Sequence, residues 1–61
     1  MTAPLRIWSR RFSVAKGWHW ESERIVSDAT ADAWLAVFHH DEPDQLFILA
    51  RTEPKDIEVI A

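Results

Sequence analysis

The sequence predicts a small two-layer α+β domain, in which one helix packs on one face of an antiparallel-rich sheet. Three observations indicate this class: two β-favouring runs flank the single glycine, a helical stripe of apolar residues follows them, and a short apolar run comes after a proline. The predicted order is therefore ββαβ within one domain. The expected elements are a hairpin over 5–26, a helix over 27–41, a third strand over 45–52 and a tail over 53–61.

The predicted hairpin turns at Gly17, the only glycine of the chain. A three-residue loop over 15–17 would place Gly17 in the left-handed conformation of a bulged turn. With Val14 opposite Trp18, one side of the hairpin collects the large apolar side chains Trp8, Phe12, Val14, Trp18 and Trp20. A loop one residue shorter would mix apolar and polar side chains on each side. We therefore expect this apolar side to form the core beneath the helix.

The helix prediction depends on apolar residues at the spacing of one helical face. The residues at positions i, i+3, i+4 and i+7 are Ala31, Trp34, Leu35 and Phe38. Ser27 is the expected N-cap, because a serine oxygen can accept a hydrogen bond from the first turn. Pro43 is expected to end the helix, since the residue before a proline avoids the helical conformation.

The predicted third strand is apolar on both sides. Leu46, Ile48 and Ala50 alternate with Phe47 and Leu49 along this run. A strand covered only by a helix would carry polar residues on its other side. We expect the side with Phe47 and Leu49 to need further cover. Either the tail, as a short strand or a single helical turn, or a partner protein could supply it.

Composition and charge narrow the function classes. The 61 residues fit one domain, and the absence of cysteine removes disulfides, thiolate zinc sites and thiol nucleophiles. No apolar run has the length of a signal peptide or a membrane span, so we expect a cytoplasmic protein that does not enter a membrane. Residues 1–24 carry a formal charge of +3 and residues 25–61 carry −6. This asymmetry favours contact with a complementary protein surface.

The sequence gives no support for catalysis or metal binding. His39 and His40 are adjacent on the predicted helix, where side chains diverge by about 100° and do not easily share one metal ion. No serine lies in a nucleophile motif, and a single glycine cannot build a phosphate-binding loop. We therefore expect a protein that is not an enzyme and has no cofactor or metal site.

Protein binding is the function that these observations favour. We expect a stand-alone modulator or inhibitor of a larger protein or complex, of a size typical of proteins encoded by bacteriophages and mobile elements. An apolar patch rimmed by arginines would mark the binding surface. The expected partner-binding residues are Phe47, Leu49, Arg6, Arg11 and Arg51.

Two alternatives remain open from the sequence. Single-stranded nucleic acid could stack on hairpin aromatics that alternate with basic residues. The residues for this alternative are Arg10, Arg11, Lys16, Trp18 and Trp20. A homodimer with a structural role is the third reading, because small domains without disulfides often gain stability by association.

Overall fold

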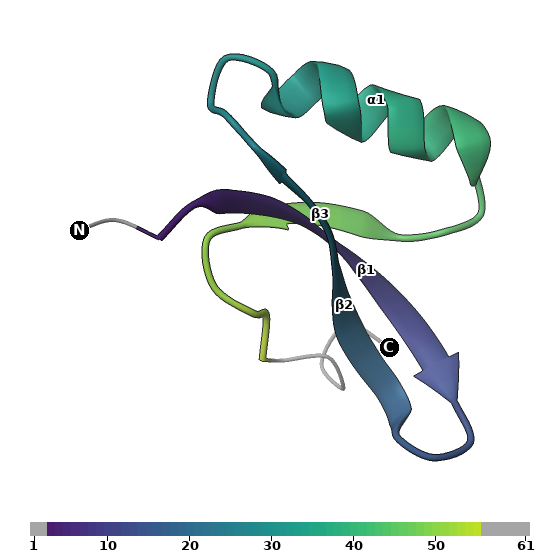
Figure 1. Cartoon of the computed structure of the whole chain (residues 1–61). Coiled ribbons are helices and arrows are strands. Elements are labelled where there is room, and N and C mark those ends of the chain that lie inside the picture. Colours follow the sequence, from purple (N-terminus) through teal and green to yellow (C-terminus); the bar gives the residue numbers. More distant parts are fainter. Residues whose placement is uncertain (1–2, 56–61) are drawn as a thin grey trace.

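The computed structural model describes residues 3–55 and has the predicted ββαβ order (Figure 1). Its elements are β1 (Leu5–Ser13), β2 (Gly17–Val26), α1 (Ala31–Asp41) and β3 (Phe47–Ala50). The strands form one antiparallel sheet in the order β2-β1-β3, with α1 packed on one side. The predicted α+β class is confirmed. Residues 56–61 of the predicted tail lie outside the described part of the chain.

The core lies between α1 and the side of the sheet that carries the odd-numbered residues of β1. Its buried members are Ile7, Val26, Ala31 and Phe47, and the side chains packed against them are Leu5, Trp34, Leu35, Phe38 and Leu49. All four residues of the predicted helical stripe belong to this cluster. The apolar spacing therefore identified the buried face of the helix correctly.

The hairpin register differs from the prediction by two residues. Phe12 pairs with Trp18, whereas the expected partner of Trp18 was Val14. The turn residue Val14 is 98% exposed. Because side chains alternate with a period of two, a shift of two residues leaves each one on the same side of the sheet. The aromatic residues of the hairpin strands therefore do share one side, as predicted.

A β-bulge in β2 separates that aromatic side from the core. Trp8 pairs with Ser22, but Ile7 pairs with Arg24, so Glu23 is an extra residue in β2. One extra residue reverses the alternation of side chains for the rest of the strand. The even-numbered residues of β2 consequently lie on the side away from α1 before the bulge, as Trp18 and Trp20 do, and on the helix side after it, as Val26 does.

This reversal corrects the predicted assignment of the two sides. Val26, beyond the bulge, lies in the core beneath α1, together with Phe47 and the half-buried Leu49. Trp8 and Trp20 are buried on the opposite side, with 8% and 7% of their surface exposed. Trp8 and Trp20, which were expected beneath the helix, thus lie on the far side of the sheet. Phe47 and Leu49, which were expected to need further cover, pack directly against α1.

Helix α1 begins three residues later than the expected N-cap Ser27 would place it. The Oγ and the carbonyl oxygen of Ser27 accept hydrogen bonds from the backbone N–H of Thr30, at 3.2 and 3.1 Å. These bonds close a separate turn, so Ser27 caps that turn and Thr30 occupies the N-cap position of the helix. The helix ends at Asp41, ahead of Pro43 as expected.

Strand β3 is shorter at both ends than the predicted 45–52. Before it, the Gln45 side chain donates hydrogen bonds to the backbone oxygens of Arg10 and Leu46. After it, Arg51 donates to the Ala3 carbonyl oxygen and to the Asp28 carboxylate, each at 3.0 Å. One backbone hydrogen bond, from the Arg10 N–H to the Leu46 carbonyl oxygen at 3.3 Å, continues the pairing just before β3, and side-chain contacts hold the chain beyond it.

Gly17 has a positive φ of 70°, as its predicted place in the turn required. A Cβ built at this position meets nothing within 4 Å, so a side chain would be opposed by the backbone conformation alone. We expect Gly17→Ala to lower the free energy of unfolding by about 1 kcal/mol. Gly17→Asn should cost less, because asparagine tolerates this conformation better. Urea denaturation measures both, and equal stability of all three proteins would contradict the positive φ.

Candidate protein-binding surface

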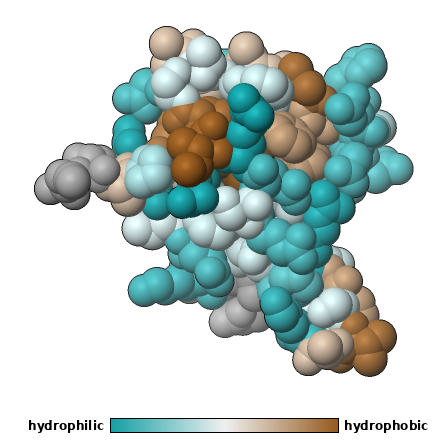
Figure 2. All heavy atoms as spheres, viewed as in Figure 1, coloured by the Kyte–Doolittle hydropathy of each residue, from teal (hydrophilic) through white to brown (hydrophobic). Residues whose placement is uncertain are grey.

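Large apolar side chains are exposed together at the end of the hairpin. Phe12 lies at the end of β1 and is 62% exposed, its partner Trp18 in β2 is 54% exposed, and Val14 projects from the turn between them. Leu46, at the start of the neighbouring segment, is 38% exposed. We call Phe12, Val14, Trp18, Leu46 and Arg10 the tip surface. Apolar atoms gather at this end of the molecule in Figure 2, where the hairpin extends beyond the helix (Figure 1).

The aromatic side chains of the tip surface are held in a defined arrangement. The Phe12 and Trp18 rings meet edge to face, with centroids 5.5 Å apart and planes inclined by 65°. The Arg10 guanidinium carbon lies 4.4 Å from the Trp18 ring centroid, in cation–π contact. Each contact stabilises its geometry by only about 0.5–1.5 kcal/mol, but together they restrict the rotamers of all three side chains. Ordered aromatic side chains lose little entropy when a partner binds.

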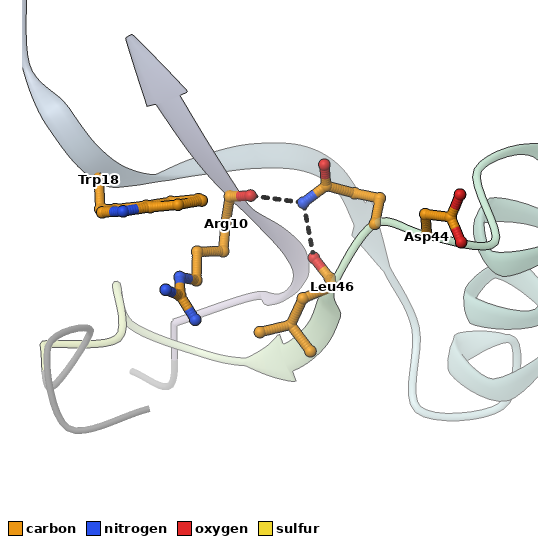
Figure 3. A pocket seen from close by; sticks show the side chains of 5 residues that line it. Arg10, Trp18, Asp44 and Leu46 are labelled. Carbon is orange, nitrogen blue, oxygen red and sulfur yellow. Dashed lines mark hydrogen bonds between the residues drawn. The ribbon is translucent and has the colours of Figure 1, made fainter. Parts of the chain in front are cut away.

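A hollow of about 250 Å³ lies beside the Trp18 ring (Figure 3). Its lining residues are Arg10, Trp18, Asp44, Gln45 and Leu46. The Gln45 amide donates a hydrogen bond to the Arg10 carbonyl oxygen, and the Arg10 N–H donates one to the Leu46 carbonyl oxygen at 3.3 Å. These two bonds hold the segment before β3 against β1 and so form one wall. The hollow is small enough to take one side chain of a partner, and it is bounded by an indole, a guanidinium and a leucine.

A network of paired charged side chains lies on the helix side of the sheet, near the C-terminal end of α1. Arg11 forms salt bridges to Glu23 at 3.2 Å and to Glu42 at 3.1 Å, and the buried Ser9 donates a hydrogen bond to Glu23. The hydrogen bond from Arg11 lowers the pKa of Glu42, and the same bond raises the pKa of Arg11. This network connects the hairpin to the C-terminal end of the helix, which is a structural role.

His19 lies on the same side of the sheet, between two acceptors. Its Nδ1 is 2.9 Å from the Gly17 carbonyl oxygen and its Nε2 is 2.8 Å from a Glu21 carboxylate oxygen. Both contacts favour the protonated ring, and the carbonyl contact has the larger effect. The pKa of His19 is therefore raised above its ordinary value of 6.5. The protonated His19 ring stabilises the folded protein through these contacts. This contribution is complete below pH 6.5 and is lost as the pH rises through the raised pKa of His19 in the folded protein.

We therefore expect the NMR titration midpoint of the His19 ring to lie above 6.5. Glu21→Gln removes the carboxylate and should lower this midpoint, while the contact with the Gly17 carbonyl oxygen is retained. A midpoint at or below 6.5, or one that Glu21→Gln leaves unchanged, would contradict the two contacts.

The structure does not bring the expected partner-binding residues together. Phe47 is 4% exposed and Leu49 is half-buried, both beneath α1. The three arginines are engaged separately: Arg11 with Glu23 and Glu42, Arg6 with Ser22, and Arg51 with Asp28 and Ala3. An exposed apolar patch rimmed by these arginines is therefore absent from the described part of the chain.

The nucleic-acid set is brought together only in part. Arg10 and Trp18 are in contact, and Lys16 lies in the adjacent turn. Arg11 points to the helix side, where two carboxylates neutralise it, and Trp20 is buried. Basic residues and exposed aromatic rings therefore coincide at a single position rather than along a surface.

Sequence reasoning missed Phe12 and Val14 as surface residues, because it assigned the whole apolar side of the hairpin to the core. An available signal was the number of large apolar residues. The helix stripe, five hairpin side chains and an apolar third strand exceed what one helix can cover. The structure exposes part of this surplus at the end of the hairpin and buries Trp8 and Trp20 on the side of the sheet away from α1.

The fold and this surface define a small ββαβ domain with an exposed aromatic hairpin end. Comparisons with protein-family models, curated proteins and solved structures find no match to the chain. Within residues 3–55, no three histidine or acidic side chains gather as metal ligands would. In the same part of the chain, no helix has the length and apolar character needed to span a bilayer.

Proposed function

We propose that this chain is a non-enzymatic protein-binding module that acts as a modulator or inhibitor of a larger protein or complex, and that it binds through the tip surface. The observation that supports the proposal is the exposure of Phe12, Val14 and Trp18 side by side at the hairpin end. Contiguous exposed apolar side chains are costly in water and commonly mark interaction sites. Aromatic and arginine side chains are also the types enriched at interface centres. The proposal retains the cytoplasmic location expected from the sequence.

Single-stranded nucleic acid is a second candidate because Arg10 is stacked on the exposed Trp18. Bases stack on such rings, and the contact would weaken steeply with salt. The aliphatic members of the tip surface, Val14 and Leu46, offer no stacking plane. Protein binding accounts for all five residues of the surface and is therefore the stronger proposal.

The proposal is tested by capture from lysate of the cells that produce the protein, after nuclease treatment, with Phe12→Ser/Trp18→Ser as the variant. An interface aromatic residue contributes about 2 kcal/mol, which is roughly 30-fold in affinity. We expect the double variant to lose its partner by more than about 100-fold. The readout is the amount of each co-purified protein, measured by mass spectrometry.

The matched control is Val37→Ser, which removes an apolar side chain that is 46% exposed on α1, away from the hairpin end. It should retain the partner fully, and thermal denaturation should show that both variants are folded. Equal retention by the tip variant and the wild type would exclude the tip surface as the binding site. Partners that disappear with nuclease would favour the nucleic-acid candidate, and recovery of a second copy of the chain alone would favour the homodimer.

A further inference from the structure

The acidic side chains of the sheet all lie on its helix side, whereas basic side chains lie on both sides. On the side away from α1, the register places Arg6 and Arg10 among apolar residues, since Arg10 pairs with Trp20 and Arg6 with Ile25. The carboxylates of the strands lie on the helix side. Glu21 is opposite Ser9, and Glu23 contacts Ser9 and Arg11. Within β1, β2 and β3, the side that continues into the tip surface therefore carries positive charge only.

Two cations accompany the apolar residues of the tip surface. Arg10 lies in the hollow against Trp18, and Lys16 is exposed in the turn. Neither forms a salt bridge with another residue of the described range 3–55. The Nε of Arg10 is buried without a hydrogen-bond partner in that range. Asp44 is the one carboxylate that lines the hollow, and it is not within salt-bridge distance of Arg10.

These charges oppose a second copy of the chain as the occupant of the tip surface. Two hairpin ends packed face to face would bring Arg10 and Lys16 close to the same residues of the other copy. Like charges in an interface cost several kcal/mol unless they are neutralised. A partner with carboxylates next to its apolar side chains would instead satisfy both features of the surface.

We propose that the tip surface binds an acidic, apolar peptide segment of its partner. One large apolar side chain of the segment packs against Phe12, Val14 and Leu46. A neighbouring Asp or Glu carboxylate accepts hydrogen bonds from the Arg10 guanidinium, and Lys16 attracts a second one. The inference rests on the proposed function and specifies the chemistry of the partner.

The test is selection of a displayed random-peptide library on the full chain, followed by affinity measurements with a synthetic copy of an enriched peptide. We expect enriched peptides to carry a net negative charge and at least one large apolar side chain. Loss of a charge-assisted hydrogen bond should make Arg10→Gln bind about tenfold more weakly. Arg51→Gln is the matched control, because Arg51 is paired with Asp28 outside this surface, and its affinity should equal that of the wild type.

Enrichment of basic or uncharged peptides, absence of enrichment, or equal affinity of Arg10→Gln and the wild type would each overturn the inference. Displacement of the synthetic peptide by oligo-dT that binds with higher affinity would also overturn it and would indicate nucleic acid as the ligand. If lysate capture depends on Phe12 and Trp18 but the selected peptides are not acidic, only this inference fails. If the peptides are acidic but lysate capture is independent of the tip surface, the proposed function fails.

Discussion

Phe47→Ala should remove most of the free energy that keeps the protein folded at room temperature. Phe47 is 4% exposed, and its ring lies 5.3 Å from that of Phe38 and 5.5 Å from that of His39, centroid to centroid. Truncating a buried phenylalanine costs about 3–5 kcal/mol, through lost burial and the cavity that remains. A domain of this length is stable by only about 5 kcal/mol in total. One side chain therefore supplies most of the margin that keeps the chain folded.

Urea denaturation and far-ultraviolet circular dichroism measure this effect. The control is Val14→Ser, which alters an apolar side chain that is 98% exposed and should change the free energy of unfolding by less than about 0.5 kcal/mol. A native-like denaturation curve for Phe47→Ala would mean that α1 does not cover β3. The sequence alone suggested that substitution of Phe47 would affect partner binding rather than folding, and the packing beneath α1 reverses that expectation.

The elements of the fold were predictable because each depends on local signals. The spacing from Ala31 to Phe38 identifies the helix and its buried face, and Gly17 locates the turn. The assignment of the two sheet sides was not predictable in the same way. It depends on one extra residue, Glu23, inside a strand whose polar residues give no local indication of a bulge. A single bulge reverses a whole half of the strand, so a small local uncertainty became a global error.

The same wrong assignment of the two sheet sides misplaced the predicted binding site. The preferred interpretation placed Phe12 and Trp18 in the core and Phe47 outside it, and only the nucleic-acid alternative placed Trp18 on the surface. The charged residues indicated part of this surface, whereas the apolar pattern placed its aromatic residues in the core. The basic residues Arg10 and Lys16 at the hairpin end were among the predicted candidates, and Arg10 is in contact with Trp18. Whether a side chain such as Arg11 is free or paired depends on Glu42, which is 31 residues away in the chain and is brought close only by the fold.

Trp34→Ala is expected to be a second strongly destabilising substitution. Trp34 is half-buried and packs on the core from α1, while the Arg24 guanidinium carbon lies 3.7 Å from its ring centroid on the exposed side. Loss of the ring removes apolar burial and the cation–π contact together. The expected decrease in unfolding free energy is about 2–4 kcal/mol, less than for a fully buried tryptophan.

A double-mutant cycle with Arg24→Gln separates the two contributions. Arg24→Gln should cost about 0.5–1 kcal/mol in the wild type, the usual range for an exposed cation–π contact, and almost nothing in Trp34→Ala. Arg24 lies just beyond the bulge, opposite Ile7. Its side chain reaches Trp34 of α1 only because the bulge reverses the alternation of side chains in β2. Equal costs of Arg24→Gln in both backgrounds would mean that the guanidinium does not rest on the ring. A coupling of the expected size would show in solution that the bulge directs Arg24 toward α1.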